Sequence, residues 1–192
     1  SSFLGNVAET NGFGGAIGQA GGIAVISQAT FSNNTGGVGA AVASLANSNL
    51  DVTASVFDGN VARIWGGAVY LQDETVHASI TGTSFANNRT TDPSAGFGGG
   101  AICLIDGTLA LASSTLADNA SLSAGGALRV LGGRATLTNV TVSGNTAQGS
   151  GGGLFVQSDG LSNPAVVNLN NVTVSDNTTD SDNNNTGDGG GI

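Results

Sequence analysis

One stretch of the chain carries oxygen-bearing side chains at alternate positions, namely Asp180, Asp182, Asn184, Thr186 and Asp188. Carboxylate and amide oxygens in this pattern are the ligands of the first part of a calcium-binding loop. The stretch departs from such a loop because Asn185 stands where a turn glycine belongs and Gly191 where a bidentate glutamate belongs. Two interpretations stay open, a weak calcium site or a solvated polar loop. We expect no other cofactor.

A second group of residues could form a contact surface. In four successive repeats of the pattern described below, the residue after a buried aliphatic is Tyr70, Cys103, Arg129 or Phe155, and Trp65 lies at a preceding turn. Alternation along a strand turns these side chains away from the core. Aromatic residues and arginine are enriched at interfaces, so Trp65, Tyr70, Arg129 and Phe155 predict a partner surface. The alternative is a face covered by a loop or a neighbouring chain.

Groups suited to catalysis are dispersed along the chain. Asp58 and Asp118 follow equivalent motifs but belong to repeats that are not neighbours, which would place them about 10 Å apart in stacked coils. Glycosidase carboxyl groups lie about 5–9.5 Å apart. The single histidine, His77, has no serine or cysteine near it in the sequence. We therefore expect no enzymatic activity.

The charge balance and the length of the apolar stretches exclude two classes of partner. The chain has no lysine, and 13 acidic residues stand against four arginines, for a net charge of −9. Nucleic-acid binding neutralises phosphates with Lys and Arg, so four scattered arginines exclude it. The longest apolar stretch, Gly39–Ala46, is far too short to span a bilayer. We expect neither nucleic-acid binding nor membrane insertion by this segment.

The elements that position these residues belong to a repeat. An apolar anchor followed three positions later by asparagine recurs seven times, with anchors 26 to 32 residues apart. The pairs are Phe3/Asn6, Phe31/Asn34, Phe57/Asn60, Phe85/Asn88, Leu116/Asn119, Val142/Asn145 and Val174/Asn177. Each is followed by an element of small residues and one aliphatic, such as Gly66-Gly67-Ala68-Val69. A third apolar alternation precedes the next anchor, as in Leu50/Val52, with Ile23/Val25 in the first repeat.

Three short alternating runs in each repeat predict three strands per coil of an all-β parallel β-helix with about six to seven coils. An antiparallel sandwich would use dipeptides such as Asn11-Gly12 and Asp58-Gly59 as hairpin turns, but these do not recur at one position of the repeat. In stacked coils the seven asparagines would form a ladder, because each amide can bond the backbone locally and its copy in the next coil. The phenylalanine anchors would stack inside one corner of the core.

The alternation of Phe-x-x-Asn with Gly-Gly-Ala-Ile/Val/Leu, as in Phe57-Asp58-Gly59-Asn60 with Gly66-Gly67-Ala68-Val69, resembles the polymorphic outer-membrane-protein repeats of bacterial surface proteins. The resemblance covers essentially the whole chain. It implies a right-handed parallel β-helix that is extracellular or displayed at a cell surface, with a structural or adhesive role.

We accordingly expect residues 1–192 to form a single, uncapped β-helix domain, either a piece of a longer solenoid or the subunit of a filament. Its partners would be other copies or the rest of the solenoid, stacked head-to-tail, together with surface glycans or proteins. The alternative function is a carbohydrate-active β-helix, related to polysaccharide lyases and hydrolases, with a site in a surface groove.

Overall fold

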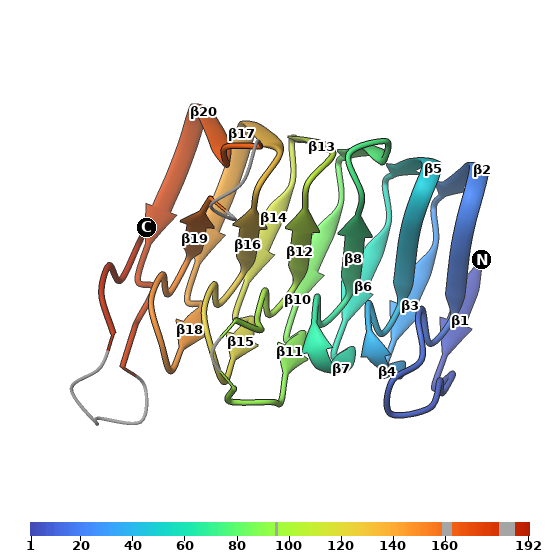
Figure 1. Ribbon diagram of the computed structural model, residues 1–192, viewed down its shortest axis with the longest axis horizontal. Coiled ribbons are helices and arrows are strands. Elements are labelled where there is room, and N and C mark those ends of the chain that lie inside the picture. The colour runs from blue at the N-terminus through green and yellow to red at the C-terminus, as the bar shows by residue number, and fades with distance from the viewer. Residues whose placement is uncertain (95, 159–162, 181–186) are drawn as a thin grey trace.

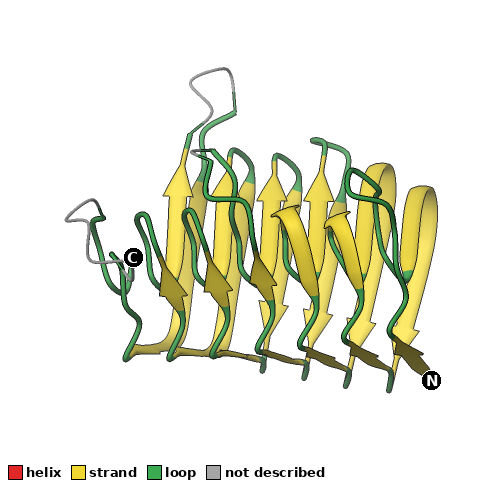
Figure 2. Ribbon diagram, turned by 90° about the horizontal axis from the view of Figure 1, so that it is seen from below, coloured by secondary structure: helices red, strands yellow, loops and turns green. Residues whose placement is uncertain are grey.

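The computed structural model describes residues 1–94, 96–158, 163–180 and 187–192, and these contain strands and no helix. Every strand pairing is parallel, and the seven anchors delimit six turns of a β-solenoid (Figure 1). Seen from below, equivalent strands of successive coils lie side by side (Figure 2). The predicted parallel solenoid is confirmed.

Four faces surround the core, because the coils after the first have a fourth strand that three alternating runs do not account for. The anchor face contains β1 (Ser2–Leu4), β3 (Thr30–Ser32), β6 (Val56–Asp58), β10 (Ser84–Ala86) and β14 (Thr115–Ala117). The additional strand follows the ladder asparagine and makes a short-strand face of β4 (Thr35–Val38), β7 (Val61–Trp65), β11 (Arg89–Thr90), β15 (Ala120–Ser121) and β18 (Thr146–Ala147).

The other two faces are named here the strap face and the open face. The strap face contains β8 (Val69–Gln72), β12 (Ile102–Ile105), β16 (Leu128–Leu131) and β19 (Leu154–Gln157). The open face contains β9 (His77–Thr81) and β13 (Thr108–Ala112). Four long strands each extend over two faces. Two of them run from the strap face to the open face, β2 (Ile17–Ser27) and β5 (Val42–Thr53). The other two run from the open face to the anchor face, β17 (Arg134–Ser143) and β20 (Val166–Ser175).

The corners between faces depend on single residues with positive φ. At the position before each ladder asparagine, φ lies between 55° and 66°, and only Gly, Asn and Asp occur there. These residue types enter the left-handed region at least cost. At Gly66, which opens a glycine element, an added Cβ would also lie 2.1 Å from the carbonyl oxygen of Val69. The repeated glycines are therefore required by the corner itself.

The core is a set of ladders along the solenoid axis. The rings of Phe3, Phe31, Phe57 and Phe85 stack with centroid separations of 4.5, 4.7 and 4.7 Å, as predicted. Leu116 pairs with Phe85 in the next coil and continues this column as a fully buried side chain. One corner of the core is therefore a continuous apolar column.

The asparagine ladder runs beside this column from Asn6 to Asn177. Each rung after Asn6 accepts hydrogen bonds at its side-chain oxygen from the amide groups of the asparagine one coil earlier. Asn34, for example, donates from its backbone N–H (3.1 Å) and its Nδ2 (2.8 Å) to Oδ1 of Asn60, and Asn60 donates in the same way to Asn88. The predicted ladder of seven asparagines is confirmed.

The two end rungs differ from the inner ones in burial. The five inner asparagines, Asn34, Asn60, Asn88, Asn119 and Asn145, are 0% exposed. Asn6 and Asn177 are half-buried, since each has an adjoining coil of this chain on one side only. Both still take part: Asn6 donates from its backbone N–H (2.9 Å) and Nδ2 (2.8 Å) to Oδ1 of Asn34, and Oδ1 of Asn177 accepts from the same two groups of Asn145 at 3.0 and 2.8 Å. All seven asparagines therefore take part in the ladder, and the two end rungs are less buried than the five inner ones.

The first coil departs from the predicted alternation. The inward side chains of β2 are Ala24 and Ile26, which pair with Leu50 and Val52, whereas Ile23 and Val25 point outward and are 71% and 73% exposed. The cause is an irregularity between Ala20 and Gly22 that shifts the pairing of β2 with β5 by one residue. A one-residue shift moves a strand's side chains to its other face.

Candidate functional site

The predicted partner surface lies on the strap face, and most of it is buried. Tyr70, Cys103, Arg129 and Phe155 do form one row across four coils. Tyr70 and Cys103 are 0% exposed and Arg129 is 2% exposed, while Phe155 is half-buried. The prediction that Tyr70 and Arg129 form an exposed contact surface is therefore wrong. The alternative of a covered face describes the structure.

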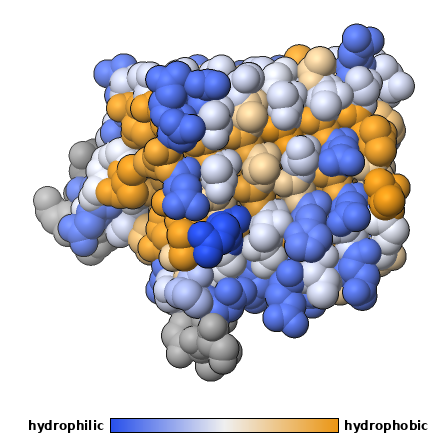
Figure 3. Space-filling view, turned by 90° about the horizontal axis from the view of Figure 1, so that it is seen from above, coloured by the Kyte–Doolittle hydropathy of each residue, from blue (hydrophilic) through white to orange (hydrophobic). Residues whose placement is uncertain are grey.

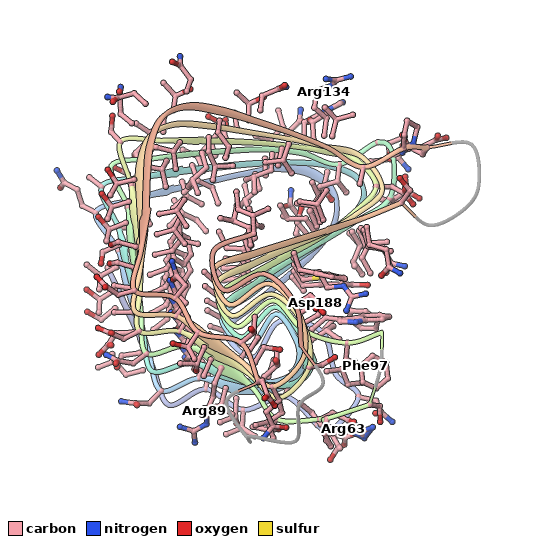
Figure 4. The ribbon with its side chains drawn as sticks, turned by 90° about the vertical axis from the view of Figure 1, so that its left-hand side faces the viewer. Arg63, Arg89, Phe97, Arg134 and Asp188 are labelled. Atoms are coloured by element: carbon pink, nitrogen blue, oxygen red, sulfur yellow. The ribbon has the colours of Figure 1, made fainter. Side chains whose placement is uncertain are left out.

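The cover is the segment of residues 91–94 and 96–98, called the strap here, which joins β11 to β12. Asp92 forms an ion pair with Arg63 at 3.3 Å, and Trp65 donates from Nε1 to the carbonyl oxygen of Gly96 at 3.0 Å. The ring of Phe97 meets Trp65 edge-on at 5.5 Å, and Trp65 in turn stacks on Tyr70 at 5.5 Å. Figure 4 shows Phe97 and Arg63 on the same side of the coil. The strap thus closes a second apolar cluster outside the main core.

Arg129 is a buried cation without a carboxylate partner in the described part of the chain. Its guanidinium donates to the carbonyl oxygen of Phe97 and, at 3.1 Å, to Oε1 of Gln157, and it lies 5.4 Å from the ring centroid of Phe155. Burial lowers the pKa of Arg129. Its Nε has no hydrogen-bond partner among the described residues, and the same holds for the hydroxyl of Tyr70.

The thiol of Cys103, next to Arg129 in the same row, is unreactive at neutral pH. Burial raises the pKa of Cys103 to about 12, although the charge of Arg129 acts in the opposite direction. Burial also raises the pKa of Tyr70, and the nearby Cys103 adds to that shift. Because the thiolate is the reactive form of cysteine, Cys103 is a packing residue at neutral pH.

The open face presents in-register rows of outward side chains to solvent, and most of these side chains are polar. Its outward rows run one residue per coil: Asn49, His77, Thr108 and Arg134 in one, Asp51, Ser79, Ala110, Thr136 and Asn168 in the next, and Thr53, Thr81, Ala112, Thr138 and Asn170 in the third. Figure 3 shows hydrophilic and neutral residues in parallel rows on this face, with hydrophobic residues between the rows and at both ends. Because successive strands pair in register, residues that are far apart in the sequence lie in parallel rows on this face.

Two adjacent hollows lie on the open face. One of about 410 Å³ is lined by Glu74, Gly107, Thr108, Gly133, Arg134, Asn163, Pro164 and Val166. The other, of about 320 Å³, is lined by Ile23, Asn49, Asp51, His77, Ala78 and Ser79. A contact of 2.7 Å between Nδ1 of His77 and Oγ1 of Thr108 joins them. This surface is not among the predictions from the sequence, although the residues between the inward positions of the third alternation could have indicated it.

The predicted calcium stretch is only partly described, since Asp182, Asn184 and Thr186 lie outside the described residues. At its far end the backbone N–H of Asp188 donates to Oγ of Ser150 at 3.3 Å. Within the described ranges, His, Cys, Asp and Glu form no group of three or more that could hold a metal ion. The calcium site remains a prediction.

Asp58 and Asp118 occupy positions that differ by one residue in the repeat. Asp58 pairs with Ala86, which pairs with Ala117, so Asp118 lies one residue beyond the equivalent position. Oδ1 of Asp58 accepts a hydrogen bond from Nδ2 of Asn87 at 2.8 Å. The Asp58 carboxylate is therefore hydrogen-bonded to Asn87, a corner residue of the next coil.

Fold and ladders define the molecule as a parallel β-solenoid built from asparagine- and glycine-containing coils. Two segments, residues 54–72 and 139–157, match the Chlamydia polymorphic membrane protein repeat, so the chain carries repeats of this type. Each match spans a ladder asparagine, Asn60 or Asn145, and the glycine element that follows it. No curated protein and no solved structure matches the chain. Within the described ranges, no helix is both long and apolar enough to cross a membrane.

Proposed function

We propose that this solenoid is a non-enzymatic protein of the cell surface that serves as a rigid scaffold and makes adhesive contacts through its open face. The observation that carries this proposal is the set of in-register rows of outward, mostly polar side chains on that face. Stacked rings and buried asparagine amides hold the interior in place, so the spacing of the outward side chains is fixed before any partner arrives. Preorganisation of this kind reduces the entropic cost of binding.

The repeat type supports the location and the role. The matched repeats are those of polymorphic membrane proteins, and a stacked-coil interior suits a protein that must hold its shape outside the cell. The strap face contributes less, because Tyr70 and Arg129 are covered and Trp65 and Phe155 are half-buried. The open face is therefore the surface that we assign to adhesion.

The test is adhesion of beads that carry the purified chain to a panel of animal and bacterial cells. The open-face variant combines Asp51→Ala, His77→Ala and Arg134→Ala. The matched control combines Arg89→Ala, Thr115→Ala and Thr173→Ala, which are exposed on the short-strand and anchor faces. We expect the open-face variant to lose most of the bound beads and the control to retain them. Equal retention by both variants contradicts the assignment.

A further inference from the structure

Arg134 is the unusual group on the open face. Of the other arginines, Arg63 pairs with Asp92, Arg129 is buried, and Arg89 is exposed on the short-strand face. Arg134 is exposed and forms no ion pair within the described residues, although Glu74 lines the same hollow. Figure 4 shows Arg134 pointing outward, on the opposite side of the coil from Arg63 and Arg89. The planar fork of a free guanidinium fits a carboxylate through two parallel hydrogen bonds.

The row that leads away from Arg134 offers neutral polar groups. Thr108 and His77 follow it one coil at a time and contact each other at 2.7 Å, and Asn49 comes next. Together they supply hydroxyl, imidazole and amide groups, which can both donate and accept hydrogen bonds. They repeat at the coil spacing of about 4.8 Å. A sugar ring with its glycosidic link has a similar length, so successive sugars can meet successive coils.

The charges beside the row limit the ligand to one acidic group. Asp51 lines one hollow and Glu74 the other, and the chain carries a net charge of −9. A polyanion would be repelled along this path. A single carboxylate at the Arg134 end meets the exposed cation of this face. Val166 and Pro164 at that end and Ile23 at the other give the C–H faces of sugars apolar contacts.

We propose that the two hollows form one binding site for an oligosaccharide that carries a single carboxylate on its terminal sugar. Arg134 binds the carboxylate, and Thr108, His77 and Asn49 bind hydroxyl groups of the sugars that follow. This site rests on the proposed function, because it gives the adhesive open face a class of ligand.

The experiment is isothermal titration calorimetry of the full chain with sialyllactose, and with lactose as the neutral counterpart. We expect sialyllactose to bind at least tenfold more tightly than lactose. Arg134→Gln should remove that difference, and His77→Ala should weaken both sugars. Arg89→Gln is the matched control and should change neither. Circular dichroism and the unfolding midpoint confirm that each variant is folded.

Three outcomes would overturn the site. They are absence of sialyllactose binding at millimolar concentrations, binding that survives Arg134→Gln, and equal binding of sodium acetate, which would reduce the site to a simple anion contact. The bead assay separates this failure from that of the proposed function. If beads adhere through the open face but the sugar does not bind, the adhesive assignment stands and the glycan site is wrong.

Discussion

At the scale of single residues, the ladder asparagines do more than cap a turn. Oδ1 of Asn119 accepts from the backbone N–H and the Nδ2 of Asn88, both at 3.0 Å. Its own Nδ2 donates to the carbonyl oxygen of Phe85 at 3.1 Å and to Oδ1 of Asn145 at 3.0 Å. One buried amide therefore satisfies polar groups in three coils. The same contacts recur along the ladder, which explains why asparagine occupies all seven positions.

Asn119→Ala should lower the free energy of unfolding by about 3 kcal/mol, because it leaves the buried N–H of Asn88 and the carbonyl of Phe85 without partners. Asn168→Ala is the control, since Asn168 is exposed on the open face and its replacement should cost little. Urea unfolding of the two variants gives the comparison. Equal midpoints for both variants would contradict the role assigned to the ladder.

At the scale of elements, the strap converts an outward strand face into a second small core. The position of the aromatic row could be predicted from the sequence, because alternation and register are local consequences of the repeat. Its burial could not, because it depends on the contacts that residues 91–94 and 96–98 make with β7 and with Arg129 of β16. No periodicity reveals contacts such as Arg63 with Asp92 and Trp65 with Gly96.

The same distinction explains the other differences between expectation and structure. The anchors, ladder and glycine corners were predictable because each is repeated and each repeat confirms the others. The outward turn of Ile23 and Val25 arises from one irregularity in one coil, which has no second copy to reveal it. The fourth strand of a coil has only two to five residues, too few for an alternating pattern to be recognised.

The buried thiol of the strap face predicts a loss of stability in alkali. The pKa of Cys103 is about 12 in the folded chain, against about 8.5 for an unperturbed cysteine. The unfolded chain therefore releases this proton at lower pH than the folded chain does. Stability is fully present below about pH 8.5 and falls as the pH rises toward 12, by up to about 1.4 kcal/mol per pH unit.

Urea unfolding at a series of alkaline pH values measures this effect. Tyr70, whose pKa is also raised, should add to the decline above about pH 10. Cys103→Ala should remove the part of the decline that begins near pH 8.5 and leave the part due to Tyr70. An identical pH dependence in the variant and the parent chain would show that the thiol is not closed off by the strap.

At the scale of the whole molecule, function depends on register. The open face can act as a surface of fixed spacing only if residues far apart in the sequence stand in one straight row. Val25, Asp51, Ser79, Ala110, Thr136 and Asn168 form such a row across six coils. The proposed adhesive role of the open face and the proposed glycan site both rest on rows of this kind.

Double electron–electron resonance, which measures the distance between two spin labels, tests the register of this row directly. The labels are placed at cysteines introduced by Val25→Cys and Asn168→Cys in a chain that also carries Cys103→Ala. Five coil steps separate the two positions, so the backbone separation should be about 24 Å despite 143 intervening steps along the chain. The pair at positions 25 and 79, two steps apart, should give about 10 Å, seen as dipolar broadening. A distribution centred far from 24 Å, or a broad one, would contradict the in-register solenoid.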